Sequence, residues 1–309
     1  MSIFLGIDGG GSKTSCVIGD DNSSLGTGTS AGSNVIRVGE RQARESLGAA
    51  VRQACAAANI SPAQVERTCV GIAGGARPEI ATVVRGLLAE FVGGEIEVVG
   101  DMVIALQAAF GRGPGVIVIA GTGALAYGRN SKGEIARAGG WGFAISDEGS
   151  GHWIGRSAVS ACMRASDEAR ADSTRMLFES IMKSWGLTTR EQLVVAANAA
   201  LNSGGAFDFA ALLPAVLSAA ATGDATAQAV LNQAGVELAT LAKIVIGRIF
   251  SNADAVPVAV SGGVFCNCET VRQVFYDRLR GEYPQVIPNV TLVDPAMGAL
   301  DLARKRGRP

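Results

Sequence analysis

One stretch near the N-terminus has residues whose types and order suit phosphate and metal chemistry. An apolar run, residues 3–7, leads to Asp8 and then to Gly9-Gly10-Gly11-Ser12-Lys13-Thr14. The run predicts a buried strand, and residues 13–18 predict a second strand that returns beside it. Glycines let the turn approach a bulky ligand closely, and its N–H groups, with its hydroxyl and ammonium side chains, can hold phosphate oxygens. Because a carboxylate repels phosphate, we expect Asp8 to act through a bridging Mg²⁺ or water.

This turn differs from a Walker P-loop. In that motif the lysine directly follows the last glycine and the loop leads into a helix, whereas Ser12 separates Gly11 from Lys13 here and a strand follows. The remaining alternative is a plain glycine-rich hairpin that binds nothing.

A second acid, Asp101, follows a predicted strand at residues 95–99. A carboxylate at a strand end could accept a proton from an attacking hydroxyl. The alternative is that Asp101 only caps the helix predicted at residues 103–110.

A third acid, Asp147, lies in the glycine-rich stretch 139–155, which also carries two tryptophans and the chain's single histidine. Long structured loops of this kind are usually functional. Asp147 could accept hydrogen bonds from sugar hydroxyls or only cap the following helix. We favour a ligand, because Trp141 supplies an apolar wall. We expect His152 to be structural, and Asn34 by default to form a turn.

The opening pattern recurs after a glycine-rich boundary at residues 111–115. Residues 116–120 predict a buried strand, Gly121-Thr122-Gly123 a turn, and residues 124–129 a returning strand. A third turn, Gly262-Gly263-Val264, follows a predicted strand at residues 256–260. We interpret this repetition as an internal duplication. Three such turns together suit a nucleotide, with phosphates at the first two and the base or ribose at the third.

Composition limits the class of protein. The 309 residues are long enough for two domains, and the net charge of −1 indicates no general attraction to nucleic acid or to an anionic membrane. The six cysteines are scattered, as is typical of a reducing cytoplasm. Cys266 and Cys268 are the one close pair, and they give only weak support for a metal site.

Alternating strands and helices predict an α/β fold of two similar domains facing a shared cleft. We expect an N-terminal domain at 1–112 and a C-terminal domain at 113–309, with a helical insertion at about 151–250. A strand at 290–293 and a helix at 296–305 complete the prediction, and the helix is expected to pack back on the first domain.

The three turns resemble the phosphate-1, phosphate-2 and adenosine motifs of the actin, hexokinase and heat-shock-70 ATPase fold, which implies two duplicated ribonuclease-H-like domains. Further segments resemble the N-acetylglucosamine kinase and glucosamine kinase branch of the BadF/BadG/BcrA/BcrD ATPase-like family. These segments are Gly32-Ser33-Asn34, Gly100-Asp101, Gly139-Gly140-Trp141-Gly142, Asp147-Glu148-Gly149-Ser150 and Trp153-Ile154-Gly155.

The resemblance implies roles for particular residues. Asp101 would be the base that takes the proton of a sugar 6-hydroxyl, and Asp8 would hold Mg²⁺. Thr14 and Thr122 would touch ATP phosphates. The residues expected to line the sugar site are Asn34, Asp101, Gly140, Trp141 and Asp147.

The sequence therefore predicts a cytoplasmic, ATP- and Mg²⁺-dependent kinase of amino sugars, with N-acetylglucosamine as first choice and glucosamine as the nearest alternative. We expect no nucleic-acid or membrane partner and consider a homodimer. An ATPase activator of a radical dehydratase or reductase, with an iron–sulfur cluster on Cys266 and Cys268, is the alternative of another class. A sugar-sensing regulator is the third.

Overall fold

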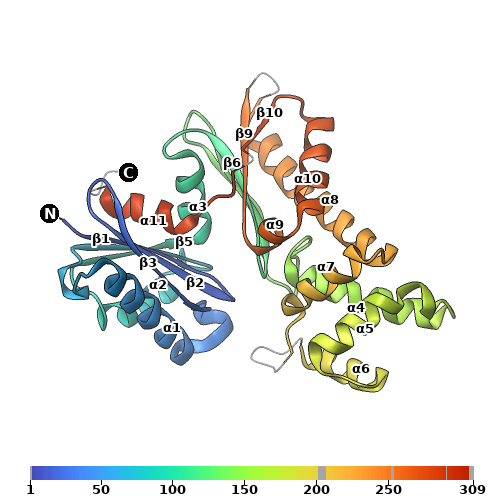
Figure 1. Cartoon of the computed structure of the whole chain (residues 1–309). Coiled ribbons are helices and arrows are strands. Elements are labelled where there is room, and N and C mark those ends of the chain that lie inside the picture. The colour runs from blue at the N-terminus through green and yellow to red at the C-terminus, as the bar shows by residue number, and fades with distance from the viewer. Residues whose placement is uncertain (1, 201–206, 252–253, 290, 306–309) are drawn as a thin grey trace. The chain divides into compact units, whose positions relative to one another are not determined.

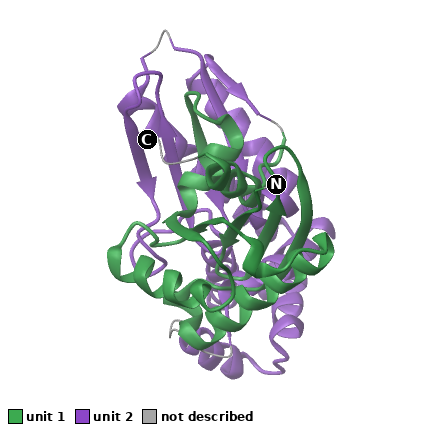
Figure 2. Ribbon diagram, turned by 90° about the vertical axis from the view of Figure 1, so that its left-hand side faces the viewer, with its two compact units in different colours: residues 1–117, 291–309 green, residues 118–290 purple. Residues whose placement is uncertain are grey.

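The computed structural model describes residues 2–200, 207–251, 254–289 and 291–305, which form two compact units (Figures 1 and 2). The first unit contains residues 1–117 and 291–309, and the second contains residues 118–290. The boundary thus falls at 117/118, compared with the expected 112/113, and the terminal helix belongs to the first unit.

The first unit is built on a five-stranded sheet in the order β3-β2-β1-β4-β5. The first three strands are antiparallel neighbours, and β4 and β5 continue the sheet parallel to β1. The strands are β1 (Phe4–Gly9), β2 (Lys13–Gly19), β3 (Ser24–Ala31), β4 (Arg67–Ile72) and β5 (Glu95–Gly100). The carboxyl ends of β1, β4 and β5 therefore share one edge, which brings Asp8 and Asp101 to the same side.

Helices cover this sheet because each has one apolar face. Ala43, Leu47 and Val51 of the first helix are completely buried at helical spacing. That helix is kinked at Gly39, whose φ of 76° is outside the helical range. The helices are α1 (Val35–Ala58), η1 (Pro62–Gln64), α2 (Pro78–Ala89), α3 (Asp101–Phe110) and α11 (Pro295–Arg304).

The last helix, α11, packs on the first strand, as the red helix beside the blue strands of Figure 1 shows. Gly6 of β1 allows this contact, since a Cβ there would lie 2.5 Å from the Ala296 oxygen. Gly298 allows an equally close approach to α3, where a Cβ would lie 2.7 Å from the Ala108 nitrogen. Leu300 is completely buried between them.

The second unit repeats the plan with a sheet in the order β10-β9-β6-β7-β8. Its strands are β6 (Gly115–Ala120), β7 (Ala124–Arg129), β8 (Ile135–Gly139), β9 (Val256–Ser261) and β10 (Val286–Pro288). Listed from the other edge, this order is β8-β7-β6-β9-β10, which matches β3-β2-β1-β4-β5 of the first sheet strand for strand. The predicted α/β duplication is thereby confirmed. The expected strand at 290–293 is wrong: the tenth strand is Val286–Pro288, Thr291–Val293 are not strand, and residue 290 lies outside the described residues.

The helical insertion lies between β8 and β9. It consists of α4 (Gly151–Asp167), η2 (Ala171–Thr174), α5 (Arg175–Trp185), α6 (Arg190–Ala199), η3 (Phe209–Leu212), α7 (Leu213–Ala221) and α8 (Ala225–Ile249). After β9 come α9 (Gly263–Asn267) and α10 (Glu269–Glu282). By length and composition α8 could cross a membrane, but 56% of its most apolar window is buried inside the molecule, as in the core helix of a globular domain.

Candidate functional site

The first glycine turn is a tight hairpin between β1 and β2. Asp8 pairs with Ser15 across the strands, and the Gly10 N–H donates to the Lys13 oxygen over 3.0 Å, which closes the turn. Ser12 and Lys13 are exposed. Their hydroxyl and ammonium groups are therefore presented to solvent at the end of a buried strand.

Asp8 is partly buried and feels the charge of two other carboxylates. Burial raises its pKa to about 7, the charges of Asp101 and Asp294 raise it further toward that value, and Lys13 opposes them. Asp101 begins α3 and Asp294 is the N-cap of α11, so the starts of two helices bring their charges to the end of β1. A cation at this point would offset the charges of Asp101 and Asp294 and favour the ionised form of Asp8.

Asp101 is not the N-cap that the alternative interpretation required. Gly100 occupies the N-cap position, and Asp101 is the first helical residue. One Asp101 carboxylate oxygen accepts the Met102 N–H over 2.9 Å, and the residue is partly exposed. Its position leaves the carboxylate partly exposed at the end of β5.

Asn34 and Thr14 are placed differently from each other. Asn34 is the N-cap of α1, where its side-chain oxygen accepts the Ile36 N–H over 3.1 Å and leaves its NH₂ group as the donor end. Thr14 is completely buried, and its hydroxyl lies 2.7 Å from the Ala31 oxygen and 2.8 Å from Ser33 Oγ. Of the two hydroxyls predicted at a phosphate in this turn, only that of Ser12 is on the surface.

The second glycine turn is fixed to the start of α4. Within the turn, the Gly121 N–H donates to the Gly123 oxygen over 2.9 Å. The Gly151 N–H donates to the Gly121 oxygen over 2.8 Å and the His152 N–H to the Thr122 oxygen over 3.3 Å. The turn therefore directs its carbonyl groups into the protein.

Asp147 lies directly on this turn. One carboxylate oxygen accepts the Ala124 N–H over 3.1 Å, and a Cβ at Gly123 would lie 3.2 Å from both oxygens. Burial raises the pKa of Asp147 to about 6, the Ala124 N–H lowers it, and the neighbouring Glu148 raises it. Capping of α4 is performed by Ser150, whose Oγ accepts the Trp153 N–H, so Asp147 is free of that role.

Trp141 stands on a segment of left-handed backbone. Gly139, Gly140 and Gly142 all have φ between 70° and 94°, which side chains rarely adopt. The Arg137 guanidinium stacks 5.1 Å from the centre of the Trp141 ring and donates to the Gly139 and Gly140 oxygens. The indole is 64% exposed, so it offers an open apolar face. Sequence reasoning missed Arg137, and neither its type nor its spacing was a signal.

The third glycine turn joins β9 to α9. Gly262 has a φ of 98°, and a Cβ there would lie 2.5 Å from the Ala120 oxygen at the end of β6. Glycine is thus required for this turn to pass close to β6, the strand that leads into the second glycine turn. Just beyond it, Cys266 is exposed and Cys268 is buried, so the two thiols have different environments.

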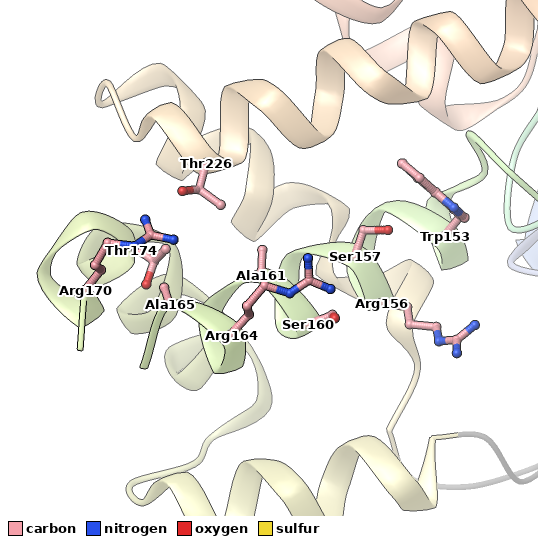
Figure 3. A pocket seen from close by; sticks show the side chains of 10 residues that line it. All are labelled: Trp153, Arg156, Ser157, Ser160, Ala161, Arg164, Ala165, Arg170, Thr174 and Thr226. Atoms are coloured by element: carbon pink, nitrogen blue, oxygen red, sulfur yellow. The ribbon is translucent and has the colours of Figure 1, made fainter. Parts of the chain in front are cut away.

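A cavity of about 440 Å³ lies elsewhere in the second unit, along one face of α4 (Figure 3). Its lining includes Arg156, Arg164 and Arg170 but none of the predicted site residues. Arg170 is ion-paired with Glu168, and the buried Asp224 caps the helix that supplies Thr226 to the wall. These acids offset the arginines, and we assign no ligand to the cavity.

Comparison with known proteins gives the family. The model of the BadF/BadG/BcrA/BcrD ATPase family matches residues 5–303. The chain belongs to the BadF/BadG/BcrA/BcrD ATPase family. Membership of this ATPase family makes ATP the nucleotide, as the resemblance implied.

Two relatives and one solved structure are similar over nearly their whole lengths. An N-acetylmuramic acid/N-acetylglucosamine kinase of Clostridium acetobutylicum is 32% identical, with 98% of this chain and 99% of that protein covered. An N-acetyl-D-glucosamine kinase of Dictyostelium discoideum is 30% identical, with 97% of each covered. A crystal structure from Chromobacterium violaceum, provisionally named an N-acetylglucosamine kinase, has 25% identity, a TM-score of 0.72 and 99% coverage of both chains. The resemblance seen in the motifs is therefore confirmed.

Proposed function

We propose that this family member transfers the γ-phosphoryl group of ATP to the 6-hydroxyl of N-acetylglucosamine, giving N-acetylglucosamine 6-phosphate and ADP. The observation that carries the proposal is that Asp8 and Asp101 lie at the same end of the sheet, beside the first glycine turn. This groups a cation ligand, a proton acceptor and hydrogen-bond donors for phosphate. The names of the similar proteins support the choice of sugar.

Asp101 is the proposed base. Its carboxylate accepts the proton of the sugar 6-hydroxyl as that oxygen attacks the γ-phosphorus and the bond to the bridging oxygen of ADP breaks. The position at the first residue of α3 supports this role, because the carboxylate is partly exposed and fixed by the Met102 N–H.

Mg²⁺ fits the chemistry of the donors at the end of β1. Carboxylate oxygens are its usual protein ligands, and one or two suffice when phosphate and water oxygens complete the octahedron. Asp8 would hold it, and within the described residues no three acidic, His or Cys side chains gather into a complete protein cage. When bound, the ion neutralises charge on the transferring phosphoryl group.

The remaining predicted residues divide between phosphate and sugar. In the first unit, the exposed Ser12 and Lys13 and the turn N–H groups are proposed to contact ATP phosphates. In the second unit the same role is proposed for the 121–123 turn, while the 262–264 turn approaches the adenosine. Asn34 donates its NH₂ group to the sugar.

The second unit supplies the other proposed sugar contacts. Trp141 offers its exposed indole face, Gly140 brings the backbone close, and Asp147 accepts hydrogen bonds from sugar hydroxyls. Asp147 is well suited to this because the Ala124 N–H donates to one of its carboxylate oxygens and so fixes the side chain.

We also propose a cytoplasmic location. The six cysteines are all free thiols, which supports a cytoplasmic location. Glucosamine is the alternative sugar, and a homodimer stays a prediction. The radical-enzyme activator would need Cys266 and Cys268 together as cluster ligands, but Cys266 is exposed and Cys268 is buried. No observation on the described residues therefore favours this alternative.

A coupled assay of ADP release with Mg-ATP tests the proposal. The panel is N-acetylglucosamine, glucosamine, N-acetylmannosamine, N-acetylmuramate and glucose, with a control that lacks sugar. We expect release that depends on N-acetylglucosamine. Dependence on glucosamine alone would move the assignment to the alternative sugar, and release that ignores every sugar would contradict a sugar kinase.

A further inference from the structure

The segment that carries Asn34 is bound directly to the first glycine turn. The Gly10 oxygen accepts the N–H groups of both Ser33 and Asn34, over 3.1 and 3.2 Å. The backbones also touch, since a Cβ at Gly32 would lie 2.6 Å from the Gly11 carbonyl carbon. The proposed sugar contact and the proposed phosphate turn therefore form one connected piece of structure.

Thr14 adds the buried half of this connection. Its hydroxyl has a single proton, and a carbonyl can only accept, so Thr14 donates to the Ala31 oxygen over 2.7 Å. The Ser33 hydroxyl, 2.8 Å away, then donates to Thr14 Oγ1. Both side chains are completely buried, so no water competes for these bonds.

This chain of bonds runs from one proposed ligand contact to the other. Thr14 is adjacent to Lys13 of the phosphate turn, and Ser33 is adjacent to Asn34. A shift of the turn when it takes up phosphate must be shared by residues 31–34, because the bonds are short and the surroundings are packed.

We propose that Thr14 is a positioning residue that couples the two substrates: its buried hydroxyl holds the 31–34 segment against the phosphate turn, so that sugar and nucleotide each strengthen binding of the other. The proposal rests on the proposed function, from which the roles of Asn34 and of the turn are taken. Coupling of this kind is reciprocal and typically changes an affinity by about 5–150-fold.

Titration calorimetry measures the coupling directly. The Kd for N-acetylglucosamine is determined with and without saturating Mg-ADP, and the ratio of the two values is the coupling factor. We expect the wild-type protein to show a ratio of at least about 5, the lower end of usual couplings. Thr14→Val, which keeps the shape but removes the hydroxyl, should lower the ratio toward one, although the two N–H bonds to the Gly10 oxygen remain.

Two further variants separate positioning from packing. Thr14→Ser keeps the hydroxyl and should restore the ratio. Thr68→Val is the matched control, because Thr68 on β4 of the same sheet is also completely buried, and its hydroxyl has no hydrogen-bond partner among the described residues. It should leave the ratio at the wild-type value.

The outcomes distinguish this inference from the proposed function. If no sugar of the panel binds to the wild-type protein, the proposed function fails. If sugar binds but the wild-type ratio is one, or Thr14→Val keeps the wild-type ratio, the coupling role of Thr14 is refuted. If Thr14→Val does not fold, Ser33→Ala carries the test, since it removes the other hydroxyl of the pair and should lower the ratio in the same way.

Discussion

Two glycines of the second glycine turn, Gly121 and Gly123, should affect different substrates when each is replaced by alanine. Neither Gly121 nor Gly123 has a left-handed φ, so the backbone of each accepts a side chain. A Cβ at Gly121 would meet nothing within 4 Å, whereas one at Gly123 would lie 3.2 Å from both Asp147 oxygens. That separation is shorter than ordinary van der Waals contact, and the carboxylate must move by a few tenths of an ångström.

The cost can be worked out from the bond that this movement weakens. The Ala124 N–H donates to the Asp147 carboxylate over 3.1 Å, and a hydrogen bond to a charged group contributes about 1.5–3 kcal/mol. If roughly half to two thirds is lost, about 1–2 kcal/mol, the KM for sugar should rise about 5–30-fold in Gly123→Ala. The KM for ATP should change little.

Steady-state ADP release, with each substrate varied at saturation of the other, measures both constants. Gly121→Ala is the matched variant, since its methyl group points into space proposed for phosphate and should raise the KM for ATP instead. An unchanged KM for sugar in Gly123→Ala, or the same pattern in both variants, would refute the placement of Asp147 in the sugar site.

Three further predictions concern single side chains. Asp101→Asn should lower kcat about 10²–10⁴-fold while ATP still binds in calorimetry, because only the base is removed; full activity would exclude Asp101 from that role. The pKa of Asp147 is raised from 3.8 to about 6, so the folded state favours the protonated acid, and the free energy of unfolding should fall as pH rises through this window. Sugar affinity should rise over the same window as the carboxylate ionises, and Asp147→Asn should abolish both changes in chemical denaturation and binding titrations across pH. Thr68→Val should raise the free energy of unfolding by about 1 kcal/mol in urea denaturation, because a buried hydroxyl without a hydrogen-bond partner among the described residues is replaced by a methyl group; a loss of stability would show that the hydroxyl is satisfied.

The arrangement of strands was predictable because its signals are local. The apolar runs before Gly9 and Gly121 are short, buried and bounded by glycines, which is typical of strands rather than helices. Because the same pattern occurs twice, it also indicated the duplication. The strand near the C-terminus was misplaced because Val286–Pro288 has only three residues and contains a proline, so it lacks the usual length and pattern.

The site was predictable in its backbone motifs and less so in its side chains. Glycine turns can be recognised from the residue types alone. The burial of Thr14, in contrast, depends on Ser33, nineteen residues away, and on the close approach of Gly32 to Gly11. Likewise Asp294 reads only as a helix start in the sequence. Its charge reaches Asp8 because α11 crosses β1, a tertiary contact that no local pattern encodes.

That crossing also has a consequence for biosynthesis. The sheet of the first unit is translated early, but the side of its central strand that faces Ala296 and Leu300 at Gly6 has no helix against it until these residues leave the ribosome. Until then the apolar groups of Phe4, Val17 and Cys69, which α11 covers in the finished protein, stay uncovered. A nascent chain must therefore carry an incomplete first unit while the second is made, and that exposed strip is where we expect a chaperone to hold it.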